Sequence, residues 1–547
     1  MVQYPSNLSD NFAFGYLSQR EESSVSEHTS GSTPGIHVQH VGTIESVSVD
    51  AAGVDRLKPN AIGLWGVIFV AVTGAAPISA MLFNVPFAVG FGTGKGTPGA
   101  FLFAAIILTI FSVSYVAMAK HIRAAGGFYS FISHGLGRDL GLITGICGAI
   151  AYSLFEVSLL GGFAYFANGN FNDWFSWDIP WPLFAFAAAL VISVFCWFDV
   201  ELSVRVLGIA LIGEVIILVL FDILVIGQGG GSSGLQWSSL NPANAFNDAA
   251  GLGTDGKAIV GAAGVGLFLA FWSWVGFEAA PNYAEESKNP VRNVPLATLI
   301  SVTGLGVLYT ITCFAFVSAF PKDKLISAAQ DPAGPFFVAM RSFGTHGLAT
   351  IMQILILTGS FACAMAFHNI AMRYFYAMGR EGVLPRQLGK THKVHRSPYV
   401  ASVTQTVISV AIIAAWGVAS GFGNAFGTAY VRVYTMMAVQ GVVWILAIQA
   451  LCALAIIVYF QKHKELNSNP LVVIVCPIIA ILGQVYAIYL LFKNIHVLAG
   501  TITYADQIWW IAILGVVISA AYAFYIKAND RPKYDLIGRV IDEGIVP

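Results

Sequence analysis

Residues 73–79 read Thr-Gly-Ala-Ala-Pro-Ile-Ser and lie halfway along a long apolar stretch, residues 61–90. Proline lacks an amide N–H and clashes with the preceding helical turn, but it suits the first position of a new helix. We therefore expect one half-helix to end near Thr73 and a second to begin near Pro77. The second would offer N–H groups to an anion, and the first would offer carbonyl groups to a cation. A proline kink in a packing helix is the alternative interpretation.

A matching feature lies five apolar stretches later, where residues 271–278 read Phe-Trp-Ser-Trp-Val-Gly-Phe-Glu. The first break lies in the first stretch and the second in the sixth. Because successive stretches cross the membrane in alternating directions and five is an odd number, stretches one to five and six to ten run in opposite directions. Corresponding breaks in two inverted halves indicate a transporter site near the middle of the bilayer. Carbonyl groups near 72–73 and 271–273, with N–H groups near 77–79, would bind an ammonium and a carboxylate. This combination suits an amino acid.

Four carboxylates lie within apolar stretches: Glu156, Glu214, Asp222 and Glu278. Each costs several kcal/mol in a bilayer unless it is paired, hydrated or protonated, so such acids are functional candidates. Because burial disfavours the charged form, we expect Glu278 and Glu214 to carry protons. For Glu278 the alternative is a structural role at a half-helix N-terminus. Glu156 is expected to contact a substrate amine or carry a proton, and the alternative is a hydrogen bond to a neighbouring helix. Asp222 is expected to be a hydrated charge near a helix end.

Aromatic and histidine side chains add further candidates. Trp272 lies at the second break, where its ring is placed to cap a substrate and contact a cation, with packing as the alternative. His368 is placed to join a proton path, although a hydrogen bond between helices is the favoured interpretation. The candidate substrate-binding residues are Thr73, Gly74, Ala75, Ala76, Ile78, Ser79, Glu156, Phe271, Trp272, Ser273, Trp274 and Gly276, and the candidate proton-coupling residues are Glu278 and Glu214.

The composition shows which elements must position these residues. Hydrophobic residues make up 56% of the 547, charged residues 10%, and the mean hydropathy is +0.72. A soluble domain carries about 25% charged residues, so this chain cannot face water on all sides. The 28 basic and 29 acidic residues nearly cancel, which excludes a nucleic-acid binder. The six cysteines show no CxxC spacing, so we expect no disulfide framework, metal site or cofactor.

Twelve apolar stretches have about the 20 residues that a membrane-spanning helix needs. None alternates as the strands of an outer-membrane barrel do, so the expected fold is an all-α polytopic membrane protein with 12 transmembrane helices. The expected spans are 61–90, 99–119, 140–167, 180–198, 203–227, 258–285, 295–320, 348–377, 399–420, 431–460, 469–492 and 506–527.

The remaining segments set the domain boundaries. Residues 1–56 are polar and are expected to form a disordered cytoplasmic tail, with no signal peptide. Residues 57–461 are expected to form a ten-helix transport core, 462–528 two peripheral helices, and 529–547 a second cytoplasmic tail. Lys and Arg gather on one set of connections, most densely at 378–398, so both termini are expected on the cytoplasmic side of the plasma membrane.

Several of these residues resemble a known family. Residues 273–278, together with 285–295, resemble the sixth-helix signature of the amino acid–polyamine–organocation (APC) permeases, and 119–129 and 376–385 support the resemblance. It covers about residues 60–460. It implies a leucine-transporter-like core of five-plus-five inverted helices, with helices 1 and 6 broken, two peripheral helices and alternating access.

The resemblance also bears on individual residues. Glu278 matches a family position implicated in gating or protonation, and Trp272 matches a substrate-stacking aromatic of a distant relative. Some proton-coupled relatives have a lysine where this chain has Glu214. Many members carry Gly-Ser-Gly at the first break, whereas this chain has Gly74-Ala75-Ala76, so a hydroxyl is absent at Ala75.

We therefore expect a secondary active transporter of an amino acid or related amine, coupled to protons. An exchanger or a sodium-coupled symporter is the alternative, and Thr358 and Ser360 are the hydroxyls in the eighth span for a sodium site. A membrane-embedded enzyme would carry an HExxH, a paired Asp motif or a Ser/Lys dyad, and a channel a repeated filter, and the sequence shows none of these. The expected partners are the substrate, a proton or sodium ion, and the lipid bilayer. The sequence leaves open the oligomeric state and which amino acid or amine is bound.

Overall fold

The computed structural model describes residues 57–122, 126–198, 200–252, 258–330, 334–423, 425–499 and 503–538. The tail expected at residues 1–56 lies outside these ranges, as do residues 539–547 of the second expected tail.

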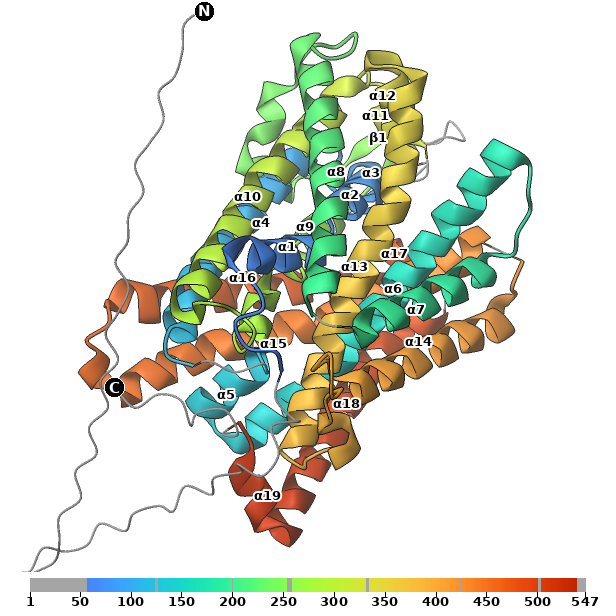
Figure 1. Ribbon diagram of the computed structural model, residues 1–547. Helices are drawn as coiled ribbons and strands as arrows, with labels where there is room; N and C mark the ends of the chain where they lie inside the picture. The colour runs from blue at the N-terminus through green and yellow to red at the C-terminus, as the bar shows by residue number, and fades with distance from the viewer. Residues whose placement is uncertain are drawn as a thin grey trace, which may run out of the picture. The chain divides into compact units, whose positions relative to one another are not determined.

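The described residues form a helical unit with one small hairpin (Figure 1). Strands β1 (Ala250–Leu252) and β2 (Ala258–Val260) pair antiparallel, with Gly251 opposite Ile259. The helices are α1 (Leu64–Gly74), α2 (Pro77–Ser79), α3 (Val85–Phe91), α4 (Thr97–Ala119), α5 (Phe128–Leu136), α6 (Arg138–Phe175), α7 (Trp181–Trp197), α8 (Val200–Gly227), α9 (Ala263–Trp272), α10 (Pro290–Ala319), α11 (Leu325–Ala329), α12 (Pro335–Phe343), α13 (His346–Arg380), α14 (Tyr399–Ser420), α15 (Met437–Lys462), α16 (Cys476–Lys493), α17 (Ile495–Ala499), α18 (Thr503–Asn529) and α19 (Arg531–Leu536).

Shorter helical turns, wider or tighter than an α-helix, connect or extend these helices. They are Ala80–Asn84, Gly94–Gly96, Trp237–Leu240, Pro242–Phe246, Phe277–Tyr283, Arg386–Gly389, Ala425–Met436, Lys464–Leu466 and Leu471–Val475.

Within the described ranges, 11 helical stretches are long and apolar enough to cross a membrane. They coincide with eleven of the expected spans, and the remaining expected span, 180–198, is the shorter apolar helix α7. An all-α polytopic fold is thus confirmed, while the count of twelve and the inverted repeat stay predictions. Several boundaries differ from those expected. The sixth helix begins at Ala263, not at 258, because Ala258–Val260 pairs with β1 as a strand. The third helix continues to Phe175, beyond 167, and the seventh begins at Pro290, before 295.

Both predicted helix breaks are present. Helix α1 ends at Gly74, and Ala76, with φ of 47°, adopts the left-handed conformation just before Pro77 begins the next segment. From Pro77 the chain stays helical through Phe91. Helix α9 ends at Trp272, and Gly276, with φ of 113°, precedes the turn Phe277–Tyr283. Such positive φ angles cannot continue a right-handed helix, so the backbone ladder is interrupted at both places.

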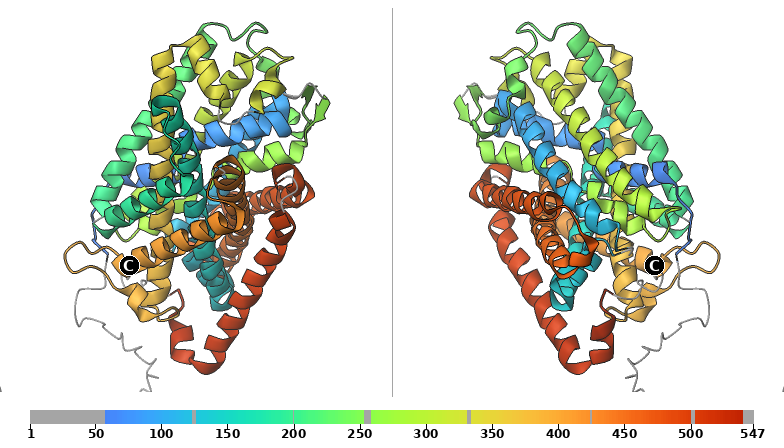
Figure 2. Two further views of the ribbon diagram at one scale, coloured as in Figure 1. Left: turned by 90° about the vertical axis from the view of Figure 1, so that its right-hand side faces the viewer. Right: turned by 90° about the vertical axis from the view of Figure 1, so that its left-hand side faces the viewer.

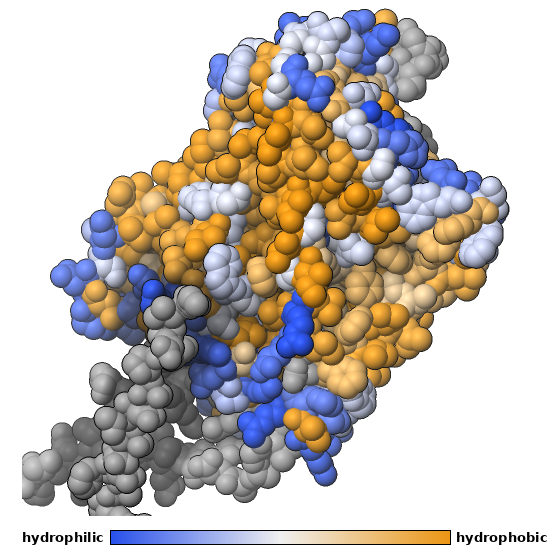
Figure 3. Space-filling view, turned by 45° about the horizontal axis from the view of Figure 1, so that its top comes forward, coloured by the Kyte–Doolittle hydropathy of each residue, from blue (hydrophilic) through white to orange (hydrophobic). Residues whose placement is uncertain are grey.

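The broken helices lie inside the bundle. Helix α6 packs along α13, α4 packs along α10, and α1 contacts α8, α10 and α13. All residues of α9 are buried, whereas α8, α14, α16 and α18 expose apolar faces. Figure 2 shows α18 running along the outside of the helical unit to the short α19. In Figure 3, apolar residues cover the middle of the visible face and hydrophilic residues gather toward its ends, as a bilayer requires.

Candidate substrate site at the two helix breaks

The two breaks touch each other through backbone atoms. A Cβ built on Gly276 would lie 2.4 Å from the carbonyl carbon and oxygen of Gly74, and one built on Gly74 would lie 3.0 Å from the Gly276 oxygen. Real Cβ atoms essentially never come as close as 2.4 Å to a neighbouring atom. The absence of a side chain at Gly276 therefore lets the first and sixth helices meet at their breaks.

A small closed cavity lies beside this contact, with a volume of about 20 Å³. That is room for about one water molecule, so binding an amino acid requires the surrounding helices to separate. No lining side chain carries a charge. The lining residues are Gly74, Ala75, Ala76, Ser79, Ala80, Asn84, Phe155, Leu159, Trp272, Ser273, Val275, Cys363, Phe367 and Tyr434. Of the predicted site residues, Gly74, Ala75, Ala76, Ser79, Trp272 and Ser273 are among them.

A chain of polar side chains connects three helices at this cavity. The Asn84 amide donates to Ser273 Oγ at 2.9 Å, and the Tyr434 hydroxyl donates to Asn84 Oδ1 at 3.2 Å. The hydroxyls of Ser79 and Ser360 lie 3.1 Å apart. The sequence reasoning missed Asn84 and Tyr434. Asn84 had a usable signal, since it is the one amide side chain in the apolar segment 77–91.

The aromatic residues at the second break point in different directions. Trp272 borders the cavity, and its ring lies 5.7 Å from that of Tyr434. Trp274 is buried away from the cavity, with its ring 4.9 Å from Tyr309. Phe271 is also buried and does not line the cavity. Only Trp272 of the three is therefore placed to contact a substrate in this cavity.

Glu214 reaches the start of the second half-helix. Its Oε2 accepts the Ile78 N–H at 3.2 Å, while its Oε1 is buried and has no hydrogen-bond partner among the described residues. Gly359 of α13 makes room, because a Cβ there would lie 2.5 Å from Ile78 and 2.8 Å from the Glu214 carboxyl carbon. The Ile78 N–H expected to be free for a substrate carboxylate is thus already bonded to a carboxyl group. Nearby, Thr73 Oγ1 is buried without a partner in the same described part.

Glu278 closes the turn at the second break. Its Oε2 accepts the Gly276 N–H at 2.9 Å, and its Oε1 accepts the Tyr152 hydroxyl at 3.0 Å. Tyr115 donates to the Glu278 backbone oxygen at 3.2 Å. Glu278 does not line the cavity, and its two accepted hydrogen bonds connect the turn at the second break to α6.

Glu156 lies behind the cavity in a buried polar cluster. Its Oε1 is 3.0 Å from His368 Nδ1, and its Oε2 accepts from the Gln405 amide at 2.5 Å. The preceding residues on the same two helices, Phe155 and Phe367, line the cavity with rings 4.9 Å apart. Both polar side chains therefore bond between helices, which is the favoured interpretation of His368.

One end of the first helix is tied to the end of the sixth. Ile62 N–H donates to the Glu286 carbonyl at 3.0 Å, and Lys288 N–H donates to the Ile62 carbonyl at 2.9 Å. The Glu286 carboxylate pairs with Arg373 at 2.5 Å, and the guanidinium lies 3.9 Å from the centre of the Tyr283 ring. Burial raises the pKa of Glu286, and Arg373 opposes this shift. These contacts hold the two broken helices together at residues that do not line the cavity.

The start of the sixth helix is likewise tied to the end of the second half-helix. Ala262 N–H donates to the Phe91 carbonyl at 2.9 Å, and Ala249 N–H donates to the Gly92 carbonyl at 2.9 Å.

Thr358, one of the two hydroxyls considered for sodium, lies on the exposed face of α13, where it bonds to its own helix. Ser360 alone of that pair reaches the site.

Comparisons with known proteins agree with this architecture. The amino acid permease family matches residues 62–519. A branched-chain amino acid permease, BcaP, of Bacillus subtilis (strain 168) is 23% identical over 57% of this chain and just under two thirds, 66%, of its own length. A methylthioribose transporter of the same organism is 24% identical over 77% of this chain and 85% of its own length. The chloroplastic cationic amino acid transporter 6 of Arabidopsis thaliana is 25% identical over 57% of this chain and 53% of its own length.

The family match covers most of the chain and both broken helices, and the relatives are transporters rather than enzymes. The chain therefore belongs to the amino acid permease family of the APC superfamily.

Proposed function

We propose that this protein is a secondary active transporter that moves an amino acid or a related amine by alternating access. The observation that carries the proposal is the contact of Gly74 with Gly276 beside an uncharged cavity. Backbone groups at broken helices recognise the charged ends of a small zwitterion without any charged side chain. The small volume of the cavity corresponds to a closed state that opens before substrate enters.

We further propose that transport is coupled to protons through Glu214. A substrate carboxylate bound at the start of the second half-helix would share that end with the Glu214 carboxyl, which accepts the Ile78 N–H. Two carboxylates at one site cannot easily both be charged, because each disfavours ionisation of the other. Substrate binding then requires Glu214 to hold a proton, and the proton in turn favours substrate binding. Glu278, already held by two donors, has the lesser part in coupling.

Uptake into proteoliposomes tests both parts. A panel of labelled amino acids and amines, with methylthioribose included because of the relative that carries it, identifies the substrate. Saturable uptake of methylthioribose alone would contradict the amino-acid proposal. With an amino acid identified, a pH gradient should drive its accumulation at equal sodium on both sides. Accumulation that needs a sodium gradient at constant pH would refute proton coupling.

The variant Glu214→Gln isolates the coupling. The amide oxygen of glutamine still accepts the Ile78 N–H, but the side chain no longer titrates. We expect accumulation driven by pH to disappear while exchange of labelled substrate across the vesicle membrane persists. Glu201→Gln is the matched control, since Glu201 lies at the exposed start of the same helix, 2.8 Å from Lys58. Accumulation that survives in Glu214→Gln would exclude Glu214 as the carrier.

A further inference from the structure

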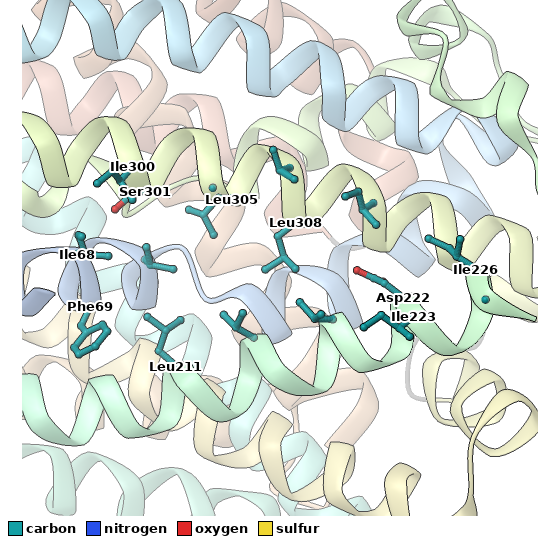
Figure 4. A pocket seen from close by; sticks show the side chains of 17 residues that line it. Ile68, Phe69, Leu211, Asp222, Ile223, Ile226, Ile300, Ser301, Leu305 and Leu308 are labelled. Carbon is teal, nitrogen blue, oxygen red and sulfur yellow. The ribbon is translucent and has the colours of Figure 1, made fainter.

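A second and larger cavity lies on the outside of the bundle. It is a groove between α8 and α10, with side chains of α1 at its base, and its volume is about 760 Å³ (Figure 4). Ile68 and Phe69 of α1 border it, as do Leu211 and Ile226 of α8 and Leu305 and Leu308 of α10. We call it the α1/α8/α10 groove. It is separate from the small cavity at the helix breaks, because no residue lines both.

The chemistry of the groove is that of a hydrocarbon site. Its lining is apolar except for Asp222 and Ser301, and Asp222 Oδ2 accepts a hydrogen bond from Thr312 at 2.9 Å. Asp222 Oδ1 and Ser301 Oγ have no hydrogen-bond partner among the described residues, but the lining holds no cationic side chain. The carboxylate end of an amino acid would therefore lose its hydration here without gaining an opposite charge, which costs several kcal/mol. The groove therefore does not suit the proposed substrate, whereas an alkyl chain needs no polar partner.

The rims of the groove are strongly exposed and apolar. Relative exposure is 40% at Val219, 61% at Ile223 and 61% at Val307. All three residues belong to helices long and apolar enough to span a membrane. A surface of this kind lies in the hydrocarbon of a bilayer, where the molecules available to fill a groove are the acyl chains of lipids.

The groove is long enough to hold a single acyl chain. At 1.5 Å per residue, the lining runs about 16 Å along α10, from Ile300 to Ile311, and about 24 Å along α8, from Leu211 to Gly227. The hydrocarbon of one leaflet is about 15 Å thick, half of a bilayer core of about 30 Å. Gly304 and Gly227 leave open space at the lining, because a Cβ at either would meet no atom within 4 Å.

We propose that the α1/α8/α10 groove binds one acyl chain of a membrane phospholipid, lying along α8 and α10 and against α1. At the base of the groove, the last residue of α1 that would contact the acyl chain is Val72, which lies next to the first helix break. A bound chain adds contacts to α1 in its present position, so the lipid favours this arrangement of the half-helix over others. The binding itself does not depend on the proposed transport function.

Photolabelling tests the proposal. The purified full-length protein is placed in nanodiscs of phosphatidylglycerol that contain a small fraction of phosphatidylglycerol with a diazirine midway along one acyl chain. After illumination, labelled peptides are mapped by mass spectrometry. We expect labelling to concentrate on α8 and α10 around Gly304, above that of the other exposed helices α14, α16 and α18.

Filling the groove should remove this label. Gly304→Phe places a ring in the open space, and we expect labelling of α8 and α10 to fall about tenfold, equivalent to about 1.4 kcal/mol. Gly169→Phe is the matched control, because Gly169 is an exposed helical glycine whose Cβ would also meet no atom within 4 Å. Gly304→Leu replaces the phenylalanine variant if that one does not fold. Equal labelling of all exposed helices, or unchanged labelling after the groove is filled, would overturn the proposal.

Discussion

Replacing Gly276 by alanine should damage the contact between the two helix breaks. The backbone at Gly276 has φ of 113°, and a Cβ would lie 2.4 Å from two carbonyl atoms of Gly74. An L-residue with a positive φ costs roughly 1–2 kcal/mol, and overpacking in a closed interior costs roughly 1–3 kcal/mol more. The sum, roughly 2–5 kcal/mol, is a large part of the 5–15 kcal/mol that stabilises a typical protein.

The same atoms predict a graded series. Gly74→Ala places a Cβ 3.0 Å from the Gly276 oxygen at a backbone conformation that alanine tolerates, so its effect should be smaller. Gly169→Ala meets no atom and, as an exposed helical glycine, should be neutral or stabilising by up to about 1 kcal/mol. We expect thermal unfolding in detergent at the lowest temperature for Gly276→Ala, then Gly74→Ala, then the wild type and Gly169→Ala.

Transport should follow the same order, because the breaks that touch are those proposed to hold the substrate. Exchange of labelled substrate, measured in proteoliposomes at matched protein content, should fall most in Gly276→Ala. A Gly276→Ala protein as stable and as active as the wild type would refute the contact and the argument built on it. Loss of stability without loss of exchange in the remaining folded protein would move the substrate away from this contact.

Three further outcomes are expected. Burial raises the pKa of Glu381 to about 8, so the folded state holds this proton more tightly than the unfolded state does. Stability should therefore fall as pH rises from about 4.5 to about 8. Glu381→Gln should remove this dependence of the unfolding temperature on pH. Tyr152→Phe leaves Glu278 Oε1 without its donor and should lower stability by about 1–3 kcal/mol, and an unchanged unfolding temperature would contradict this. Single cysteines at 385 and 330 in a cysteine-free variant should react with membrane-impermeant reagents from opposite sides, and reaction of both from outside would contradict the predicted topology.

Local sequence was enough to predict where the helices break. Proline at 77 after Gly-Ala-Ala and glycine at 276 among aromatics permit the interrupted backbone seen at both places. Neither residue type is sufficient alone, since Pro295 and Gly304 lie inside the continuous helix α10. The positions of the helices followed from apolar runs, because a bilayer sets the minimum length that each must reach. Their ends followed less well, since α6 has 38 residues and continues past the apolar run into the polar residues 168–175. The start of the sixth helix was wrong because an apolar run does not distinguish helix from strand, and residues 258–260 pair with β1.

Contacts between helices could not be predicted in this way. Glu214 meets Ile78 across 136 positions, and Asn84 meets Tyr434 across 350 positions. Spacing along one helix tells which residues share a face, but it does not tell which helix lies opposite that face. For this reason the candidate list contained the residues of the two breaks, while it placed Trp274 at the site and omitted Asn84 and Tyr434.

The contacts around the first half-helix indicate how the cavity opens. At the breaks, Gly74 and Gly276 meet by van der Waals contact, whereas at the far end Ile62 is tied to the sixth helix by two backbone hydrogen bonds. Each such bond contributes about 0.5–1.5 kcal/mol, and the buried pair of Arg373 and Glu286 lies beside them. Opening the Ile62 end breaks these bonds, while separating the breaks breaks none between the two glycines. Widening the cavity also separates Asn84 from Ser273, which costs one side-chain hydrogen bond, against two backbone hydrogen bonds at Ile62. Under the proposed alternating access, we therefore expect the cavity to adapt to a substrate at a smaller cost than release of the Ile62 end.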